Sequence, residues 1–131
     1  MLTINVPEDC GNAPNKRLLK DWFVHLVEGN LKDALLMLDE KVTVRVFGYW
    51  ETKDKQSLQK QLASFQHNPF IEASIHTIIT HGRDAALNGE IIDEDQTEFH
   101  VCLFFTLSMG RKRLIKTIDA YVMKISSYEV S

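Results

Sequence analysis

The sequence has few cysteines, no long apolar run and no excess of positive charge. Its two cysteines, Cys10 and Cys102, lie in an irregular N-terminal arm and in a very apolar segment, so we expect no disulfide framework. No apolar stretch approaches the length of a membrane span, and residues 1–10 lack the basic start and apolar run of a signal peptide. We therefore expect a cytoplasmic protein that does not interact with membranes.

Basic residues do not form the stripe that is typical of nucleic-acid binding. The formal net charge is -3, and the densest basic run, Arg111-Lys112-Arg113, directly follows Gly110, as at a solvated hairpin tip. Metal-ligand spacings, glycine-rich phosphate loops and nucleophile elbows are also missing. His76 and His81 are five apart in an expected strand, which puts them on opposite faces. We predict no nucleic-acid partner, no metal and no cofactor.

The 131 residues fit one domain, with residues 1–14 as an irregular arm. The first half predicts helices. Apolar residues at a helical spacing begin at Leu18 and end before Gly29, and a second, short, leucine-rich helix follows Asn30. Residues 42–47 alternate as in a strand, and a third helix begins near Asp54 or Ser57.

From residue 73 onwards the apolar residues alternate with a period of two. Strands are predicted over 73–81, 85–92, 97–107 and 114–125, joined by short turns that favour antiparallel hairpins. Helices first and a meander afterwards indicate an α+β fold, with N-terminal helices on a curved, mainly antiparallel sheet. Both faces of the last two strands are apolar, and three helices cannot cover both. We therefore expect a homodimer through the sheet.

This order of elements resembles the nuclear transport factor 2-like superfamily, which includes the SnoaL-like domains. The resemblance covers residues 15–125, and its most specific stretches are residues 26–31 with 42–44, residues 83–90 and residues 110–121. It implies a cone-shaped fold with a pocket. The fold hosts isomerases, cyclases, dehydratases, epoxide hydrolases and non-catalytic binding proteins, so the fold alone assigns no function.

The resemblance also allows the known catalytic positions to be compared with this sequence. In the ketosteroid-isomerase branch, the proton-shuttling aspartate corresponds to Val46 and the hydrogen-bonding tyrosine to Trp22, and neither residue can do that chemistry. The polyketide-cyclase branch often ends in a pocket aspartate preceded by His-Trp. The matching run, residues 112–119, keeps that residue as Asp119 and lacks the His-Trp.

Asp119 is therefore the foremost candidate for a catalytic acid/base, with His100 and Tyr121 as hydrogen-bonding partners. It could equally be a hydrogen-bonded residue of the pocket wall or rim. Cys102 could act with His100 and Asp119 as a nucleophile, or simply fill apolar space. The residues expected to line the pocket are Trp22, His25, Val46, Trp50, Phe65, Cys102, Phe104 and Thr117.

The aromatic character of these positions favours a hydrophobic or aromatic small molecule as ligand, although large aromatics could also fill the cone. Two functions stay open at this point. One is a small-molecule enzyme of the isomerase, cyclase or hydrolase type that uses a pocket carboxylate. The other is a non-catalytic ligand-binding or protein-interaction module. A structure separates them by showing whether Asp119 faces a cavity.

Overall fold

A computed structural model of the protein describes residues 2–7, 13–64 and 68–125. Within these residues, three helices and seven strands follow one another: β1 (Thr3–Asn5), α1 (Pro14–Glu28), α2 (Leu31–Leu36), β2 (Leu38–Val46), β3 (Trp50–Thr52), α3 (Lys55–Ser64), β4 (Phe70–His81), β5 (Asp84–Asp93), β6 (Glu98–Leu107) and β7 (Ile115–Ile125). None of the described helices is long and apolar enough to cross a membrane.

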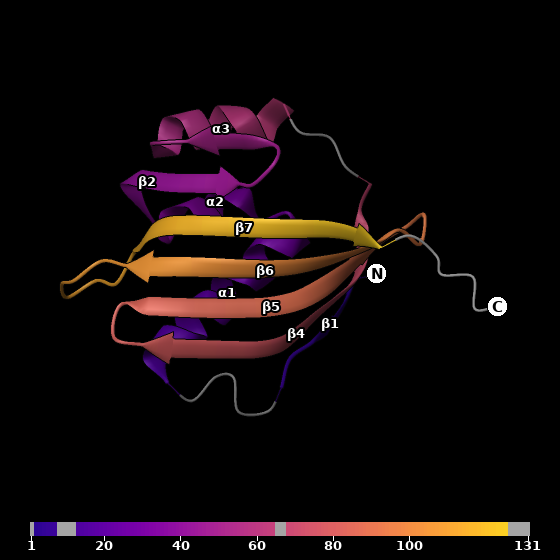
Figure 1. Ribbon diagram of the computed structural model, residues 1–131, viewed down its shortest axis with the longest axis horizontal. Coiled ribbons are helices and arrows are strands. Elements are labelled where there is room, and N and C mark those ends of the chain that lie inside the picture. Colours follow the sequence, from indigo (N-terminus) through magenta and orange to yellow (C-terminus); the bar gives the residue numbers. More distant parts are fainter. Residues whose placement is uncertain (1, 8–12, 65–67, 126–131) are drawn as a thin grey trace.

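The strands form one mixed sheet in the order β1-β4-β5-β6-β7-β2-β3. Strands β4 to β7 are an antiparallel meander, as the sequence predicts. On one side of the meander β2 pairs in parallel with β7, and on the other side β1 pairs in parallel with β4. Helices α1 and α2 lie behind the sheet in Figure 1, and α3 lies beside β2 and β3 at the far edge. The predicted α+β architecture, with helices on a mainly antiparallel sheet, is confirmed.

Helix α1 begins and ends where its sequence predicts. Pro14 stands at the start, where a missing N–H costs nothing, and Gly29 ends the helix in the left-handed conformation at φ 82°. The buried residues Leu19, Trp22, Phe23 and Val27 form the apolar stripe. This stripe packs on the sheet, and the Trp22 ring meets the Phe105 ring edge to face, with 5.5 Å between centroids.

The alternation along β6 decides which side of the sheet is covered. Val101, Leu103, Phe105 and Leu107 are buried beneath the helices. His100, which precedes Val101, and Phe104, which lies between Leu103 and Phe105, are exposed. Successive side chains of a strand point to opposite faces, so His100 and Phe104 lie on the face away from the helices. We call this the open face.

The alternation of β7 is interrupted near its start. Strict alternation puts Ile115 on the same face as Thr117 and Asp119, yet Ile115 and Ile118 are both buried, at 0% and 3% exposure. The register between β6 and β7 shifts between Thr106 and Leu107, which marks a β-bulge or irregularity. An extra residue in one strand reverses the faces beyond it, so Ile115 joins the core.

The N-terminal arm is also more regular than expected. Thr3–Asn5 is a strand that pairs in parallel with β4, from Thr3 opposite Glu72 to Asn5 opposite Ser74. A strand of three residues has no periodicity of its own and depends on its partner for its hydrogen bonds. The short strand β3 was not expected either, for the same reason.

Helix α3 begins at the expected capping residue. The Asp54 carboxylate accepts a hydrogen bond from the Ser57 backbone N–H at 2.6 Å, and the Asp54 carbonyl accepts the N–H of Leu58. The hydrogen bond from the Ser57 backbone lowers the pKa of Asp54. Leu58 is the buried anchor of the helix. Phe65, expected to line the pocket, lies outside the described residues.

Candidate functional site

The sequence-predicted site residues are divided between the two faces of the sheet. Trp22 and His25 belong to α1 and lie on the covered side, whereas His100, Asp119 and Tyr121 lie on the open face. Cys102, Phe104 and Thr117 share the open face with them. The structure thus divides these residues between both faces of the sheet, because Val101, Leu103, Ile118 and Ala120 occupy the positions that face the helices.

Asp119 forms an ion pair with Arg45 of the neighbouring strand β2. Asp119 Oδ1 accepts a hydrogen bond from Arg45 Nε, and Asp119 Oδ2 accepts one from Nη2, both at 2.8 Å. The hydrogen bond and charge of Asp119 raise the pKa of Arg45 above its ordinary value. Both carboxylate oxygens thus contact one guanidinium, in a bidentate geometry that fixes how the two side chains are oriented.

His100 and Tyr121 do not join Asp119 in one catalytic group. Asp119 lies opposite Phe104 on β6. His100 comes four residues before Phe104 in that strand, so about 13 Å separates His100 from the position opposite Asp119. Tyr121 instead stacks on Phe47, with centroids 4.6 Å apart, and meets Phe104 edge to face at 6.0 Å. The predicted combination of acid/base and hydrogen-bonding partners is therefore not assembled here.

A shallow hollow does adjoin Asp119 on the open face. Its volume is about 190 Å³, and its lining includes the predicted residues Phe104, Thr117 and Asp119 together with Asp84 and Thr106. A larger hollow of about 510 Å³ lies between α2 and α3, lined by residues such as Leu31, Leu35 and Leu62. Neither of these two cavities lies between α1 and the sheet.

The covered side contains polar atoms that lack partners. Trp22 Nε1, His25 Nδ1 and Thr52 Oγ1 are all buried, and none has a hydrogen bond within the described structure. Trp22 and His25 are three residues apart, so they lie on one side of α1. Thr52 pairs with the buried Val44 and shares its face. Native proteins rarely leave such groups without protein, water or ligand partners, because each costs about 1–3 kcal/mol.

The surroundings of these atoms are apolar. Val46 and Trp50, two predicted lining residues, are partly buried and pack against the core. Among the described residues, the buried polar or charged side chains are Thr52 and Asp93. The Asp93 carboxylate stabilises the turn that follows it, because it accepts hydrogen bonds from the backbone N–H groups of Asp95 and Thr97. The covered side therefore offers hydrogen-bonding groups without a free buried carboxylate. No pattern in the sequence indicated Thr52, because β3 was not expected.

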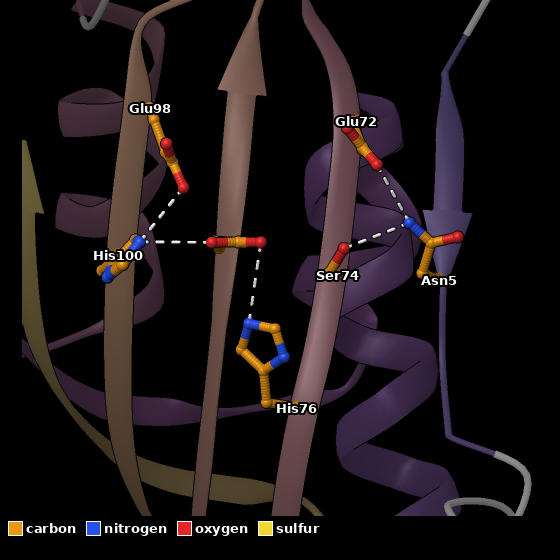
Figure 2. A network of polar contacts seen from close by, with 7 residues as sticks. Asn5, Glu72, Ser74, His76, Glu98 and His100 are labelled. Carbon is orange, nitrogen blue, oxygen red and sulfur yellow. Dashed lines mark hydrogen bonds and ion pairs between the residues drawn. The ribbon is translucent and has the colours of Figure 1, made fainter. Parts of the chain in front are cut away.

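The sequence did not predict that a second group of chemically active side chains meets on the sheet. His76, Glu90 and His100 come from β4, β5 and β6, and Glu98 lies two residues before His100. Figure 2 shows this group at one end of the open face, beside the contacts of Asn5 with Glu72 and Ser74. The pKa of Glu98 lies below its ordinary value, first because of its hydrogen bond with Glu90 and then because of that with His100.

Comparison with known structures identifies the fold. A nuclear transport factor 2-like protein of unknown function from Burkholderia xenovorans superposes with a TM-score of 0.70 at 10% identity, covering 87% of this chain and 86% of that one. A nuclear transport factor 2-like protein of unknown function from Cytophaga hutchinsonii gives 0.66 at 13% identity, covering 86% and 92%. An LEH-like epoxide hydrolase from M. tuberculosis gives 0.65 at 17% identity, covering 82% and 80%.

The chain therefore has the cone-shaped α+β fold of the nuclear transport factor 2-like superfamily, as its sequence predicts. No known family profile matches the sequence, and no curated protein matches it. At these identities the similar structures establish the fold and no activity.

Proposed function

We propose that the chain is a small-molecule-binding protein whose ligand enters between α1 and the sheet by displacing packed apolar side chains, since neither of the two cavities described above lies there. The observation that supports this most is the pair of unpartnered atoms on α1, Trp22 Nε1 and His25 Nδ1, both buried. The indole nitrogen can only donate a hydrogen bond, whereas the imidazole nitrogen donates or accepts according to its tautomer. A ligand that satisfies both atoms removes a cost that the free protein bears.

The surroundings of these two atoms define the class of ligand. Phe105 lies against Trp22, and Val46 and Trp50 add further apolar surface on the same side. A suitable ligand has an apolar or aromatic body and one carbonyl or hydroxyl oxygen that accepts the Trp22 N–H. Small sites of this type are mostly apolar, and a few polar groups fix the ligand's orientation.

The positions and partners of the carboxylates favour a binding function over acid/base catalysis. Asp119 is engaged by Arg45 on the open face, and no free buried carboxylate occurs among the described residues of the covered side. A general base must reach a substrate proton from a free lone pair. The absence of such a carboxylate among the described interior residues favours the non-catalytic alternative.

A titration with 1-naphthol tests this proposal, because that molecule joins an aromatic body to one hydroxyl. We expect saturable binding, followed by the fluorescence of the naphthol, and about tenfold weaker binding to Trp22→Phe, which loses one hydrogen bond and keeps an aromatic ring. Phe104→Leu, on the open face, is the matched control and should bind as the native chain does. Equal affinities for the native chain and Trp22→Phe, or no saturable binding, would contradict the proposal.

An enzyme that uses Asp119 is the second candidate, favoured by the hollow of about 190 Å³ beside this residue. One structurally similar protein is an epoxide hydrolase, a chemistry that needs activated water. In this case Arg45 would orient the carboxylate, and a substrate would occupy the hollow on the open face. Hydrolysis of styrene oxide by the native chain, abolished in Asp119→Asn, would establish this candidate; no turnover would leave binding as the function.

We also propose that a second copy of the chain covers the open face. Five large apolar side chains are exposed there or at its edge, and together we call them the apolar patch: Phe47, Ile79, Phe104, Tyr121 and Met123. The open face of five strands measures roughly 30 Å by 20 Å, or about 600 Å², close to what one partner contributes to a stable complex. None of the five side chains is charged, so the apolar patch itself can be buried against a second copy without removing a charge from water.

Sedimentation equilibrium tests the dimer at micromolar concentrations. Tyr121→Lys should shift the chain towards the monomer, because two buried ammonium groups would face an apolar surface. Met109→Lys is the control, since Met109 is also exposed but lies in the turn before β7, outside the apolar patch. A native chain that remains monomeric would refute the dimer. A cytoplasmic location stays a prediction from the sequence.

A further inference from the structure

The group at the end of the open face is built from three neighbouring strands. Glu90 and His100 are direct partners across β5 and β6, and Glu98 lies two residues before His100 on the same face of β6. His76 lies where the register of β4 shifts between Ile75 and Thr77. Such an irregularity turns a side chain away from its regular direction, and Figure 2 shows the His76 ring beneath the central carboxylate of the group.

The interatomic distances match those between the ligands of one small cation. His100 Nε2 lies 3.1 Å from Glu90 Oε2 and 3.2 Å from Glu98 Oε1. One ligand atom from each of Glu90, Glu98 and His100 lies within 4.8 Å of the others. Tetrahedral zinc, with bonds of about 2.0–2.2 Å, separates its ligand atoms by about 3.3–3.6 Å. The three side chains can therefore close around an ion by side-chain adjustments alone.

His76 can supply a fourth ligand. Its Nε2 lies 3.8 Å from Glu90 Oε1, so Glu90 is placed between the two imidazoles. All four side chains are between 29% and 53% exposed in the single chain, where the site is accessible to an ion from solvent. A water molecule can complete the coordination if His76 stays in its present position.

The chemistry of these groups selects a transition metal. Two imidazole nitrogens with two carboxylates suit zinc, cobalt or nickel, whereas calcium and magnesium prefer sites made of oxygen alone. The ion pairs that Glu90 and Glu98 make within the described residues are with histidines. An ion between these two carboxylates offsets the repulsion of like charges at close range.

We propose that Glu90, Glu98 and His100, with His76 as the fourth ligand, form a binding site for a divalent transition metal, best matched by zinc. The site is separate from the proposed ligand site beneath α1 and does not depend on it. It also revises the prediction from the sequence that no metal is bound, because the four residues have no ligand spacing along the chain and meet only through the pairing of β4, β5 and β6.

Isothermal titration of the chelator-treated full chain, without an affinity tag, with zinc chloride tests the proposal. We expect one zinc per chain with a dissociation constant in the micromolar range or below, and at least tenfold weaker binding to His100→Asn and to Glu98→Gln. Cobalt should give visible absorption bands that both variants lose. Each variant is first checked for the native circular-dichroism spectrum and melting temperature.

Two further variants serve as matched controls. His81→Asn removes an exposed histidine from the end of β4, and Glu72→Gln removes a carboxylate on the same face of that strand. Both should bind zinc as the native chain does. Zinc binding that is equally strong in His100→Asn and Glu98→Gln, or that needs millimolar metal in the native chain, would overturn the proposal.

Discussion

The structure predicts that the substitution Gly89→Ala, which adds a single methyl group, lowers the stability of the chain markedly. Gly89 lies in β5 opposite Ile75 of β4, beside the register shift at His76. A Cβ atom at this position would overlap the carbonyl oxygen of Ser74, and it would lie 3.2 Å from the Ser74 carbonyl carbon and 3.4 Å from Ile75 Cα. All three atoms belong to the backbone, so no side-chain rotation relieves the overlap.

The expected cost of Gly89→Ala follows from these contacts. Relieving the overlap requires β4 and β5 to separate locally, which costs about 1–3 kcal/mol for overpacking and about 1 kcal/mol for each ladder hydrogen bond that is lost. The smaller entropy of the unfolded alanine chain returns about 0.4–1 kcal/mol. We therefore expect a loss of roughly 3 kcal/mol, a large fraction of the 5–15 kcal/mol that stabilises a typical domain.

Urea unfolding followed by tryptophan fluorescence measures this loss. Asn88→Ala is the control, because Asn88 is the exposed neighbour in the same strand, and it should change the unfolding free energy by no more than about 0.5 kcal/mol. A Gly89→Ala variant that is within about 1 kcal/mol of the native chain would refute the close approach of β4 and β5.

Three other predictions concern the core, a helix cap and acid stability. Phe105→Ala should cost about 3–5 kcal/mol in urea unfolding because the ring is 2% exposed, and the same change at the half-exposed Phe104 should cost far less. Asp54→Ala should lower the melting temperature by removing the cap of α3, whereas Asp54→Ser should restore most of it. The pKa of Glu98 is lower in the folded chain, so its stabilisation is complete above its unfolded value near 4.5 and is lost as the pH falls through the folded value. Glu98→Gln should therefore reduce the loss of stability as the pH falls below about 4.5, and an unchanged acid-unfolding curve would contradict this.

The sequence predicted the fold well because its strands carry a clear alternation. In β6 the buried Val101, Leu103 and Phe105 alternate with side chains on the open face, as expected. The sequence did not predict features that depend on pairing with other strands, because the local pattern of apolar residues does not encode them. A register shift brings Ile115 into the core, and Thr3–Asn5 and Trp50–Thr52 are strands only because neighbouring strands pair with them.

The candidate sites were harder to predict because they depend on pairing between distant segments. Arg45 and Asp119 meet through the parallel pairing of β2 with β7, across 74 positions of sequence. Nothing in either segment indicates that Asp119 has a guanidinium partner. The alternation of β7 correctly put Asp119 and Tyr121 on one face, but it did not reveal which face the helices cover.

Nuclear magnetic resonance of the indole N–H groups tests the central claim, a ligand site beneath α1, most directly. The chain has two tryptophans, so a ¹⁵N-labelled sample gives two indole signals, and Trp22→Phe assigns them. On addition of 1-naphthol we expect the Trp22 signal to move downfield along a saturable curve, because its N–H gains an acceptor. A Trp22 signal that stays in place while signals of open-face residues move would show that the ligand binds elsewhere and would contradict the account.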